Sequence, residues 1–319
     1  MSNNTIVGAM YVVMGVFGIA ENGLTAFLIG SDREMRNPTY IYMVNLCLCD
    51  ALTLISIAFY SGMIIIYPPI AASLTKISAF VTAVTWSGAC QFIVLMTFSR
   101  YVQLKSAHKM PVYFKKRNLI ISVLVPWLLP AIFYSWVLFY DPTPFRFIAD
   151  RCAWQFDEVN RTGSAMAILH IVLLCIISLI VNFFSIKTLI HVHTMRKQVH
   201  TIETHANAVR EIKLATQCVI TGTLFTVAAI SFFVVSALQN HMSTIAFVMA
   251  HCMWILNAMQ YPLIYFALNS LLRDRFAAVF CAKRYHCPGG SAQSSVQCLK
   301  SDSTYIKKNS EGPLATTRF

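Results

Sequence analysis

Long apolar runs separated by short polar connectors make up most of this chain. A helix that crosses a membrane needs ~20 mostly apolar residues. Seven runs reach that length: residues 6–30, 40–66, 72–103, 118–140, 165–190, 212–238 and 243–268. The pattern predicts an all-α fold, a seven-transmembrane helix bundle. We expect three parts: a short segment 1–5, a membrane domain 6–282, and a tail 283–319 whose Ser, Gly and Lys content is typical of disorder.

The composition agrees with a membrane protein. Hydrophobic residues make up 57% of the chain and charged residues 12%, and the mean hydropathy is +0.60. Soluble domains carry about 25% charged residues. The 319 residues are therefore interpreted as one membrane domain rather than two soluble ones.

The distribution of Lys and Arg predicts how the chain lies in the cell membrane. With the amino terminus outside, the inner segments 31–39, 104–117, 187–213 and 269–319, together with Arg100, hold 21 of the 25 Lys and Arg. Cytoplasmic loops attract this excess. We therefore expect a multi-pass protein with an extracellular amino terminus and a cytoplasmic carboxyl terminus. The inner loops account for the net charge of +12 without a nucleic-acid partner.

Two glycosylation sequons agree with that orientation. Asn3 and Asn160 each stand in an N-x-[ST] pattern, and both fall on the predicted outer side. A third candidate, Asn37, is blocked by Pro38 and falls on the inner side. We expect Asn3 and Asn160 to be glycosylated.

Two polar residues lie midway along neighbouring apolar runs, Asn22 in the first and Asp50 in the second. A charged side chain at the centre of a bilayer costs at least ~2.5–3.5 kcal/mol on insertion scales. An Asn and an Asp on adjacent helices can pair by hydrogen bond, which would remove both from lipid. The pair is either a helix–helix clasp or part of a functional switch, and the two residues alone leave both interpretations open.

The predicted inner ends of two runs carry further patterns. Arg100 and Tyr101 close the third run, where an Arg can also simply extend toward the membrane surface. Pro262, in the run Tyr261-Pro262-Leu263-Ile264-Tyr265, permits a kink near the inner end of the seventh run, with simple packing as the alternative. An amphipathic stretch, 270–280, follows and is expected to lie on membrane lipids. Cys281 at its end is a candidate for palmitoylation, with a free thiol as the alternative.

Taken in order, these motifs resemble those of a rhodopsin-like G-protein-coupled receptor over roughly residues 8–282. The residues that carry the resemblance are Asn22, the run 35–39 that leads into 45–50, Arg100, Tyr101, Trp127, Pro262 to Tyr265, Asn269, Arg273 and Cys281. The resemblance implies activation by a small extracellular ligand and coupling to a heterotrimeric G protein. It also implies a possible Na⁺ site at Asp50 and switch roles for Arg100, Tyr101, Asp50, Asn22, Asn257, Pro262 and Tyr265.

Several positions depart from the usual receptor pattern. Ser99 replaces the acid before Arg100, and Tyr261 replaces the Asn before Pro262, although Asn257 remains one turn earlier. Thr75 stands where a Cys would clamp the second outer loop, so Cys152 has no expected partner. Such departures are typical of the nematode serpentine chemoreceptors, and the chain most resembles their Srx or Srt type.

The sequence excludes some ligands. The seventh run contains no Lys for a retinal Schiff base, and Thr82 stands where amine receptors of this class carry an Asp. The candidates for the ligand pocket are Thr82, Trp86, His170, His251 and Trp254. They would form an aromatic pocket for a small apolar or weakly polar ligand. Bundle packing is the alternative role for each of them.

Other functions leave signatures that are weak or missing here. A seven-span ligand-gated channel subunit or transporter would need charged pore-lining helices or inverted repeats. The predicted spans hold only Glu21 and Asp50 as acids, and no repeat is present. No metal-ligand spacing, Gly-x-Ser-x-Gly or phosphate loop points to an enzyme, so no catalytic residue is predicted. Ser and Thr in the tail are candidates for phosphorylation and arrestin binding.

Overall fold

The computed structural model describes residues 3–32, 35–68, 72–139, 145–156, 161–198, 202–238 and 241–281. The chain divides into two units, Met1–Arg273 and Asp274–Phe319. The first unit holds the helix bundle. In the second, the described part is residues 274–281, which belong to helix α10, Ser270–Cys281.

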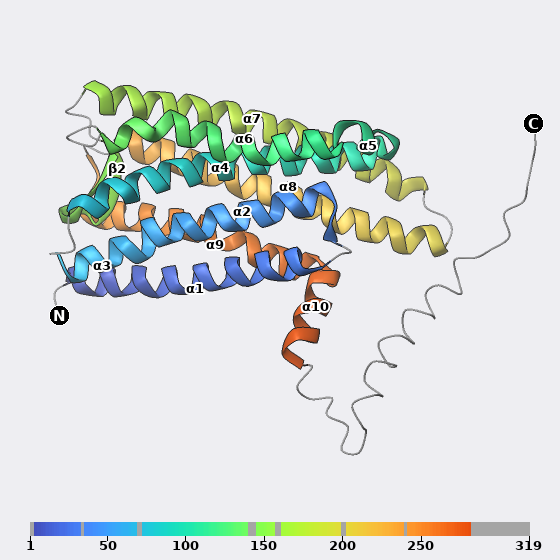
Figure 1. Ribbon diagram of the computed structural model, residues 1–319, viewed down its shortest axis with the longest axis horizontal. Helices are drawn as coiled ribbons and strands as arrows, with labels where there is room; N and C mark the ends of the chain where they lie inside the picture. The colour runs from blue at the N-terminus through green and yellow to red at the C-terminus, as the bar shows by residue number, and fades with distance from the viewer. Residues whose placement is uncertain are drawn as a thin grey trace, which may run out of the picture. The chain divides into compact units, whose positions relative to one another are not determined.

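The first unit is a bundle of long helices that run side by side (Figure 1). Their bounds are α1 Asn3–Ser31, α2 Pro38–Leu54, α3 Ser61–Ile66, α4 Ala72–Lys105, α6 Lys116–Tyr134, α7 Arg161–Gln198, α8 Ile202–Leu238 and α9 Thr244–Leu268. A π-helical segment, Ile55–Tyr60, joins α2 to α3 into one continuous span. A short helix α5, Met110–Tyr113, lies between α4 and α6. The predicted all-α bundle is confirmed.

Within the described residues, six helices are long and apolar enough to cross a membrane: Asn4–Ser31, Pro38–Ile66, Leu74–Lys105, Lys116–Leu138, Arg161–Thr194 and Ile212–Val235. Helix α9 completes the seven-helix bundle and packs against α1, α2 and α8. Its 25 residues include the polar residues His251, Asn257 and Gln260. Two of these three, His251 and Asn257, are buried inside the bundle.

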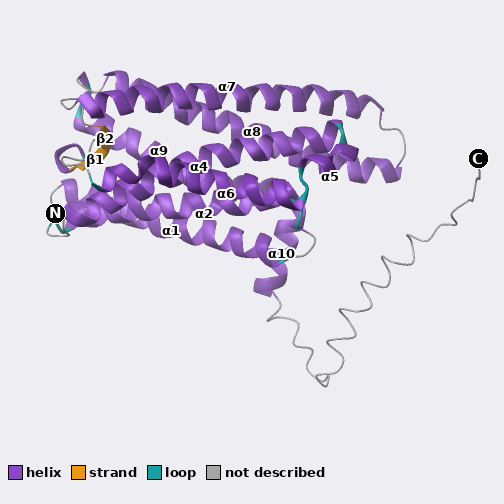
Figure 2. Ribbon diagram, turned by 45° about the horizontal axis from the view of Figure 1, so that its top comes forward, coloured by secondary structure: helices purple, strands orange, loops and turns teal. Residues whose placement is uncertain are grey.

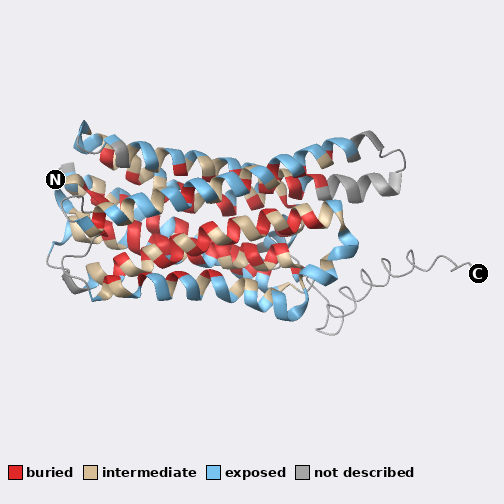
Figure 3. Cartoon of the chain, turned by 90° about the horizontal axis from the view of Figure 1, so that it is seen from above, coloured by how far each residue is buried: buried red, intermediate tan, exposed pale blue. Residues whose placement is uncertain are grey.

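Exposed residues lie along the outward faces of the helices (Figure 3), and many of them are large and apolar. Phe17 is 67% exposed, Ile132 72% and Leu179 72%. A soluble protein rarely exposes apolar surface on this scale. Lipid tails solvate such a surface, while the backbone polar groups are satisfied inside each helix. The outer faces therefore confirm the membrane-domain interpretation.

Helix α4 is the central element of the bundle and packs against α2, α6, α7 and α8. Its buried side chains, among them Phe92, Ile93 and Met96, lie in the larger apolar core. A second apolar core lies near the end of the bundle that carries the two strands, and includes Ile57 and Val84. Helix α4 carries the candidate pocket residues Thr82 and Trp86. It also carries the predicted switch residue Arg100.

The helices extend beyond the predicted runs. Helix α7 continues to Gln198, and α8 begins at Ile202, so most of the predicted inner connector, residues 187–213, is helical. Residues such as Lys, Arg, Glu and Ala have high helix propensity. A helix can therefore continue into water after its apolar run has ended, and hydropathy alone does not mark its end.

A two-stranded hairpin, absent from the sequence-based expectation, lies at one end of the bundle (Figure 2). Strand β1, Phe145–Ile148, pairs antiparallel with β2, Ala153–Phe156, with Phe145 opposite Phe156 and Phe147 opposite Trp154. Aromatic residues alternate with other residues in both runs, which is the period of a strand. We call this end of the bundle the hairpin end and the opposite end the Arg100 end.

The predicted amphipathic stretch after the seventh run is a helix, α10, Ser270–Cys281. Asn269 links it to the bundle: its Nδ2 donates to the Tyr40 hydroxyl at 3.0 Å and its Oδ1 accepts from the Leu272 amide at 3.3 Å. Arg273 donates to two carbonyl groups at the end of α9. The side chain of Cys281, the palmitoylation candidate, is outside the described residues.

Close contact between α1 and α3 depends on Gly62. A Cβ atom at this position would lie 2.5 Å from the Gly8 carbonyl oxygen and 2.9 Å from the Val12 amide nitrogen. We expect Gly62→Ala to force the helices apart and to cost about 1–3 kcal/mol of stability, measured as a lower midpoint of thermal unfolding in detergent. The control is Gly23→Ala, since a Cβ there meets no atom within 4 Å. Equal midpoints in the two variants would contradict this prediction.

Candidate functional site

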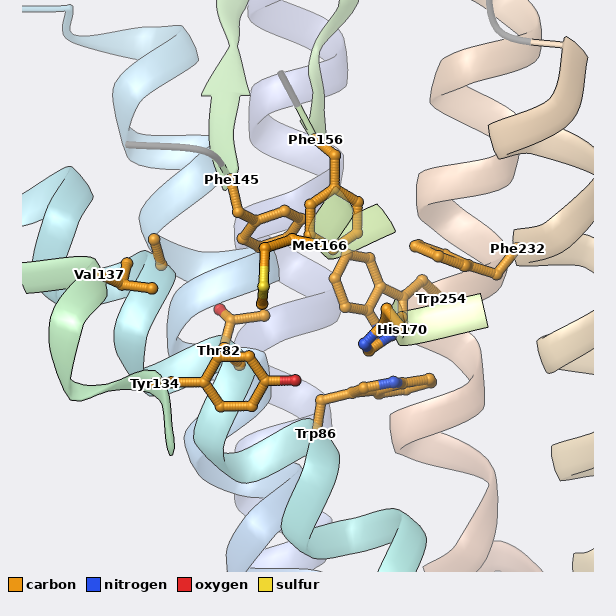
Figure 4. Close-up of a pocket in the computed structure, with 12 residues that line it drawn as sticks. Thr82, Trp86, Tyr134, Val137, Phe145, Phe156, Met166, His170, Phe232 and Trp254 are labelled. Carbon is orange, nitrogen blue, oxygen red and sulfur yellow. The ribbon is translucent and has the colours of Figure 1, made fainter. Parts of the chain in front are cut away.

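A small pocket, with a cavity volume of about 30 Å³, lies at the hairpin end (Figure 4). Helices α4, α6, α7, α8 and α9, the turn after α6, and both strands contribute side chains to it. The lining residues are Ala79, Thr82, Ala83, Trp86, Tyr134, Val137, Phe145, Phe156, Met166, His170, Phe232 and Trp254. Thr82 and Trp86 are one helical turn apart on α4, so both face the same side. The pocket therefore draws on most of the bundle.

Aromatic rings make up most of its wall. The rings of Trp86 and Trp254 meet edge to face with centroids 5.3 Å apart. The His170 ring lies 5.4 Å from that of Phe232 and 5.8 Å from that of Phe156. Edge-to-face and tilted arrangements of this kind are favourable between aromatic rings. The result is an aromatic box that is closed above by the hairpin.

Four of the five predicted pocket residues meet in this box: Thr82, Trp86, His170 and Trp254. The fifth, His251, lines an adjacent pocket that shares Trp86 and Trp254. His251 is buried, its Nε2 lies 2.7 Å from the carbonyl oxygen of Ile57 in the π-helical segment, and its ring packs against Tyr11 at 4.8 Å. His251 thus joins α9 to the α2–α3 span at the edge of the box.

Sequence reasoning missed the roof of the box and part of its wall. Phe145 and Phe156 come from the hairpin, and Tyr134, Met166 and Phe232 come from three different helices. The aromatic alternation of the two strands was a signal for the first pair. The other three carry no sequence signal that separates them from the many apolar residues in the same spans.

Three non-covalent contacts attach the hairpin to the bundle. The Tyr11 hydroxyl donates to the Cys152 carbonyl at 3.0 Å, and Trp154 Nε1 donates to Ser61 Oγ at 2.7 Å. The Arg151 guanidinium lies over the Phe247 ring, 4.9 Å from its centroid, a cation–π contact. The three anchors come from α1, α3 and α9. Together they hold the roof over the pocket.

No disulfide takes part in this attachment among the described residues. Cys152 is a free, buried thiol, as the sequence predicted. Thr75, which stands at the position of the usual partner, shares a hydrogen bond of 2.8 Å with the Tyr60 hydroxyl instead. Burial and the neighbouring Asp150 raise the pKa of the Cys152 thiol.

Asp50 and Asn22 are both buried at the centre of the bundle. The hydrogen bond expected between them is absent, so that expectation was wrong. Asn22 Nδ2 donates instead to the carbonyl oxygens of Gly18 at 2.9 Å and Ala258 at 3.0 Å, and thereby ties α1 to α9. Asn22 Oδ1 and Asp50 Oδ2 have no hydrogen-bond partner among the described residues. Two buried acceptor atoms therefore lie in the middle of the bundle.

The seventh-span residues near Asp50 form a separate polar group. Asn257 Oδ1 accepts from Gln260 Nε2 at 2.7 Å and from the Tyr261 hydroxyl at 3.4 Å. Tyr261, which replaces the usual Asn, is fully buried. Asn257 is thus engaged within α9 rather than with Asp50.

At the Arg100 end, Arg100 is 1% exposed. Its Nη1 donates to Gln103 Oε1 at 3.0 Å, and its guanidinium lies 5.9 Å from the centroid of the Tyr40 ring. Ser99, in the place of the usual acid, shares a hydrogen bond of 2.8 Å with Thr39 of α2. The replacement therefore exchanges a local ion pair for a contact between α4 and α2.

The other predicted switch residues lie around this centre. Tyr265 is fully buried and its hydroxyl lies 3.7 Å from the Met96 sulfur, which connects α9 to α4. Pro262 is buried within α9. Tyr101 packs on Phe184 of α7, with ring centroids 5.6 Å apart. Tyr265 and Tyr101 thus each join α4 to a neighbouring helix.

Comparison with known families identifies this arrangement. The family model of the "Serpentine type 7TM GPCR chemoreceptor Srx" matches residues 12–269, from α1 through α9. The chain belongs to the Srx serpentine chemoreceptor family. The Srx match fits the departures at Ser99, Thr75 and Tyr261 that set this chain apart from the usual receptor pattern.

Other relatives of this Srx chain are more distant. Somatostatin receptor type 1 from Rattus norvegicus and from Mus musculus are each 26% identical to it over 139 residues, 41% of this chain and 35% of the relative. The match thus spans about a third of the length of these curated relatives. The crystal structure of squid rhodopsin aligns with a TM-score of 0.74 at 15% identity, over 98% of this chain and 92% of that one. That likeness shows the seven-helix fold.

The buried Cys152 thiol reports on the hairpin. Because thiolate is the reactive form and the pKa of Cys152 is raised, we expect slow alkylation near neutral pH that accelerates only above the range of an ordinary cysteine. Tyr11→Phe should speed labelling by about twofold to tenfold, since one hydrogen bond contributes about 0.5–1.5 kcal/mol. Mass spectrometry of the Cys152 peptide measures the rate. Tyr113→Phe, an exposed tyrosine, is the control, and an unchanged rate in Tyr11→Phe would refute the role of the anchor.

Proposed function

We propose that this Srx chain is a chemosensory receptor that binds a small extracellular molecule in the aromatic box and activates a heterotrimeric G protein at the Arg100 end. The observation that carries the proposal is that one helix, α4, serves both ends. It contributes Trp86 to the box and the buried Arg100 to the opposite end. The two residues are 14 positions apart, about 21 Å along a helix at 1.5 Å per residue.

A path of side-chain contacts lies between the two ends. Trp86 meets Trp254 of α9, and further along α9 the Tyr265 hydroxyl reaches Met96 of α4, one turn from Arg100. A ligand that shifts α9 against α4 at the box would move both contacts. A packed pair of helices with two alternative arrangements can transmit such a shift from one site to another.

The proposal includes an orientation. The hairpin end faces the outside and the Arg100 end the cytoplasm, which is supported by the excess of Lys and Arg in the segments at the Arg100 end. Glycosylation at Asn3 and Asn160 would then be extracellular. Asn160 and the side chain of Asn3 lie outside the described residues, as does the Ser- and Thr-containing tail proposed to bind arrestin. Lipids would contact the amphipathic stretch 270–280, with palmitoylation at Cys281.

The decisive test is expression in reporter cells with a panel of small volatile and soluble metabolites. Nucleotide exchange on the G protein and membrane current are read together. We expect exchange without a current. A current without exchange would overturn the receptor proposal and favour a channel.

Substitution of the predicted coupling residue sharpens the test. Arg100→Ala should reduce ligand-stimulated exchange to the basal level while surface expression is retained, because the buried guanidinium at the Arg100 end is lost. The control is Arg161→Ala, an exposed arginine at the start of α7. Equal stimulation in both variants would show that Arg100 has no part in coupling.

We also propose that Asp50 binds Na⁺, as the family resemblance implies. The unpartnered oxygens Asp50 Oδ2 and Asn22 Oδ1 support this, because hard cations prefer carboxylate and carbonyl oxygens. Asn257, engaged within α9, would contribute less. Asp50 would bind the ion, and the positive charge of Na⁺ would balance the negative charge of the Asp50 carboxylate at the centre of the bundle.

Replacement of Na⁺ by choline tests this role. In the parent protein we expect the potency of an agonist, or the basal exchange rate, to change severalfold with the cation. Asp50→Asn keeps the side-chain volume, removes the charge and should abolish that sensitivity. If both proteins respond to the cation alike, or neither responds, Asp50 is a packing residue.

A further inference from the structure

Three side chains that line the aromatic box carry a hydrogen-bond donor without a partner among the described residues. Thr82 Oγ1, Trp86 Nε1 and Trp254 Nε1 are buried atoms without a hydrogen-bond partner among the described residues. The Thr82 and Trp86 side chains are only 1% and 5% exposed. All three side chains line the same pocket (Figure 4).

Other indoles of the chain are treated differently. Trp127 Nε1 donates to Asn45 Oδ1 at 3.0 Å, and Trp154 Nε1 donates to Ser61 Oγ at 2.7 Å. Burial of a donor without an acceptor is costly, and lipid cannot supply the acceptor. The indole N–H groups of Trp86 and Trp254 differ from these because neither has a partner among the described residues. The two groups also occur together, on rings that meet edge to face.

The box holds two indole groups and two hydroxyl groups, and a neutral His170 adds one donor and one acceptor nitrogen. An indole nitrogen can only donate. The Tyr134 hydroxyl, which also lines the box, already accepts from Ser87 Oγ at 3.4 Å, which leaves its own proton as a further donor. A ligand that satisfies these groups must bring acceptor atoms.

The box is also uncharged. None of its twelve lining residues is Asp, Glu, Lys or Arg. An ammonium ligand would find no carboxylate there, and a carboxylate ligand no guanidinium or ammonium. Burial of an ion without a counter-ion is strongly unfavourable. Aromatic faces can attract a cation, but the unpartnered donors of Thr82, Trp86 and Trp254 need an acceptor, which an ammonium group is not. The wall therefore favours a neutral molecule with an acceptor atom.

We propose that the box takes a neutral, largely apolar carbonyl compound, a ketone, ester or lactone, whose oxygen accepts from the indole N–H groups of Trp86 and Trp254. This ligand class rests on the proposed receptor function and narrows it. A carbonyl oxygen has two lone pairs and can accept from two donors at once. The aromatic rings around it bury the apolar part of the molecule. Thr82 supplies a further donor from the same face of α4 as Trp86.

Binding to the purified full-length chain in detergent tests the ligand class without any signalling step. The probes are small aromatic ketones, esters and lactones, each paired with an isostere in which a methylene group replaces the carbonyl oxygen. Acetophenone with α-methylstyrene is one such pair, and benzylamine and benzoate are the charged probes. Ligand-induced shifts in thermal unfolding, titrated with probe, give the affinities.

We expect carbonyl probes to bind about tenfold more tightly than their isosteres and the charged probes to bind not at all. Three results would overturn the proposal: equal affinity of ketone and isostere, tighter binding of the amine or the carboxylate, or no binding by any carbonyl probe.

Substitutions test whether the indole N–H groups and the Thr82 hydroxyl cause the tighter binding of carbonyl probes. Trp86→Phe and Trp254→Phe keep an aromatic ring and remove the N–H, and Thr82→Val removes the hydroxyl at similar volume. In each Phe variant the ratio of ketone to isostere affinity should fall about fivefold, whereas a general loss of folding would lower both affinities together. Trp127→Phe removes an indole N–H outside the box and should leave the ratio unchanged. An unchanged ratio in both pocket Phe variants would refute the role of the indoles.

The signalling assay separates this proposal from the receptor function. If carbonyl probes bind with a Trp-dependent preference but evoke no nucleotide exchange, the ligand class stands and the proposed function fails. If an amine or a carboxylate evokes exchange that depends on Arg100, the receptor function stands and the ligand class fails.

Discussion

Lipid offers no hydrogen bonds, and this constraint organises the molecule. Polar side chains inside the bundle therefore form bonds between helices. Asn22 joins α1 to the Ala258 carbonyl of α9, and Trp127 joins α6 to Asn45 of α2. Thr53 and Thr85 link α2 to α4 at 2.7 Å in the same way. Each bond fixes the rotation of two helices about their axes, which apolar contacts alone specify weakly. The framework on which the pocket depends is held by a few such bonds.

Where the same constraint is left unsatisfied, the structure marks a site. The unpartnered indole groups of Trp86 and Trp254 gather at the hairpin end, and the unpartnered oxygens of Asp50 and Asn22 gather at the centre of the bundle. The first group consists of donors and the second of acceptors. In the two proposals, the first group would bind a neutral acceptor molecule and the second group would bind a cation.

The hairpin shows how a divergent receptor keeps an ordered roof without a disulfide. A disulfide constrains the unfolded chain and stabilises by about 2–4 kcal/mol. Two hydrogen bonds, from Tyr11 and Trp154, and the cation–π contact of Arg151 act on the same segment. Such contacts can open and close individually, which a covalent bond cannot. The roof of this pocket is therefore secured by reversible contacts to three helices.

The sequence by itself determined the seven spans, the burial of Asp50, the free state of Cys152 and four members of the aromatic box, since hydropathy, helical spacing and motif order are local properties. It did not determine the partner of Asn22, the helical connector or the hairpin roof with Phe145. Those depend on which side chains of distant segments meet once the helices have packed. The local sequence around an Asn, a Phe or a Trp is the same whether or not a partner from a distant segment lies within reach. Only the tertiary structure decides whether that partner is present.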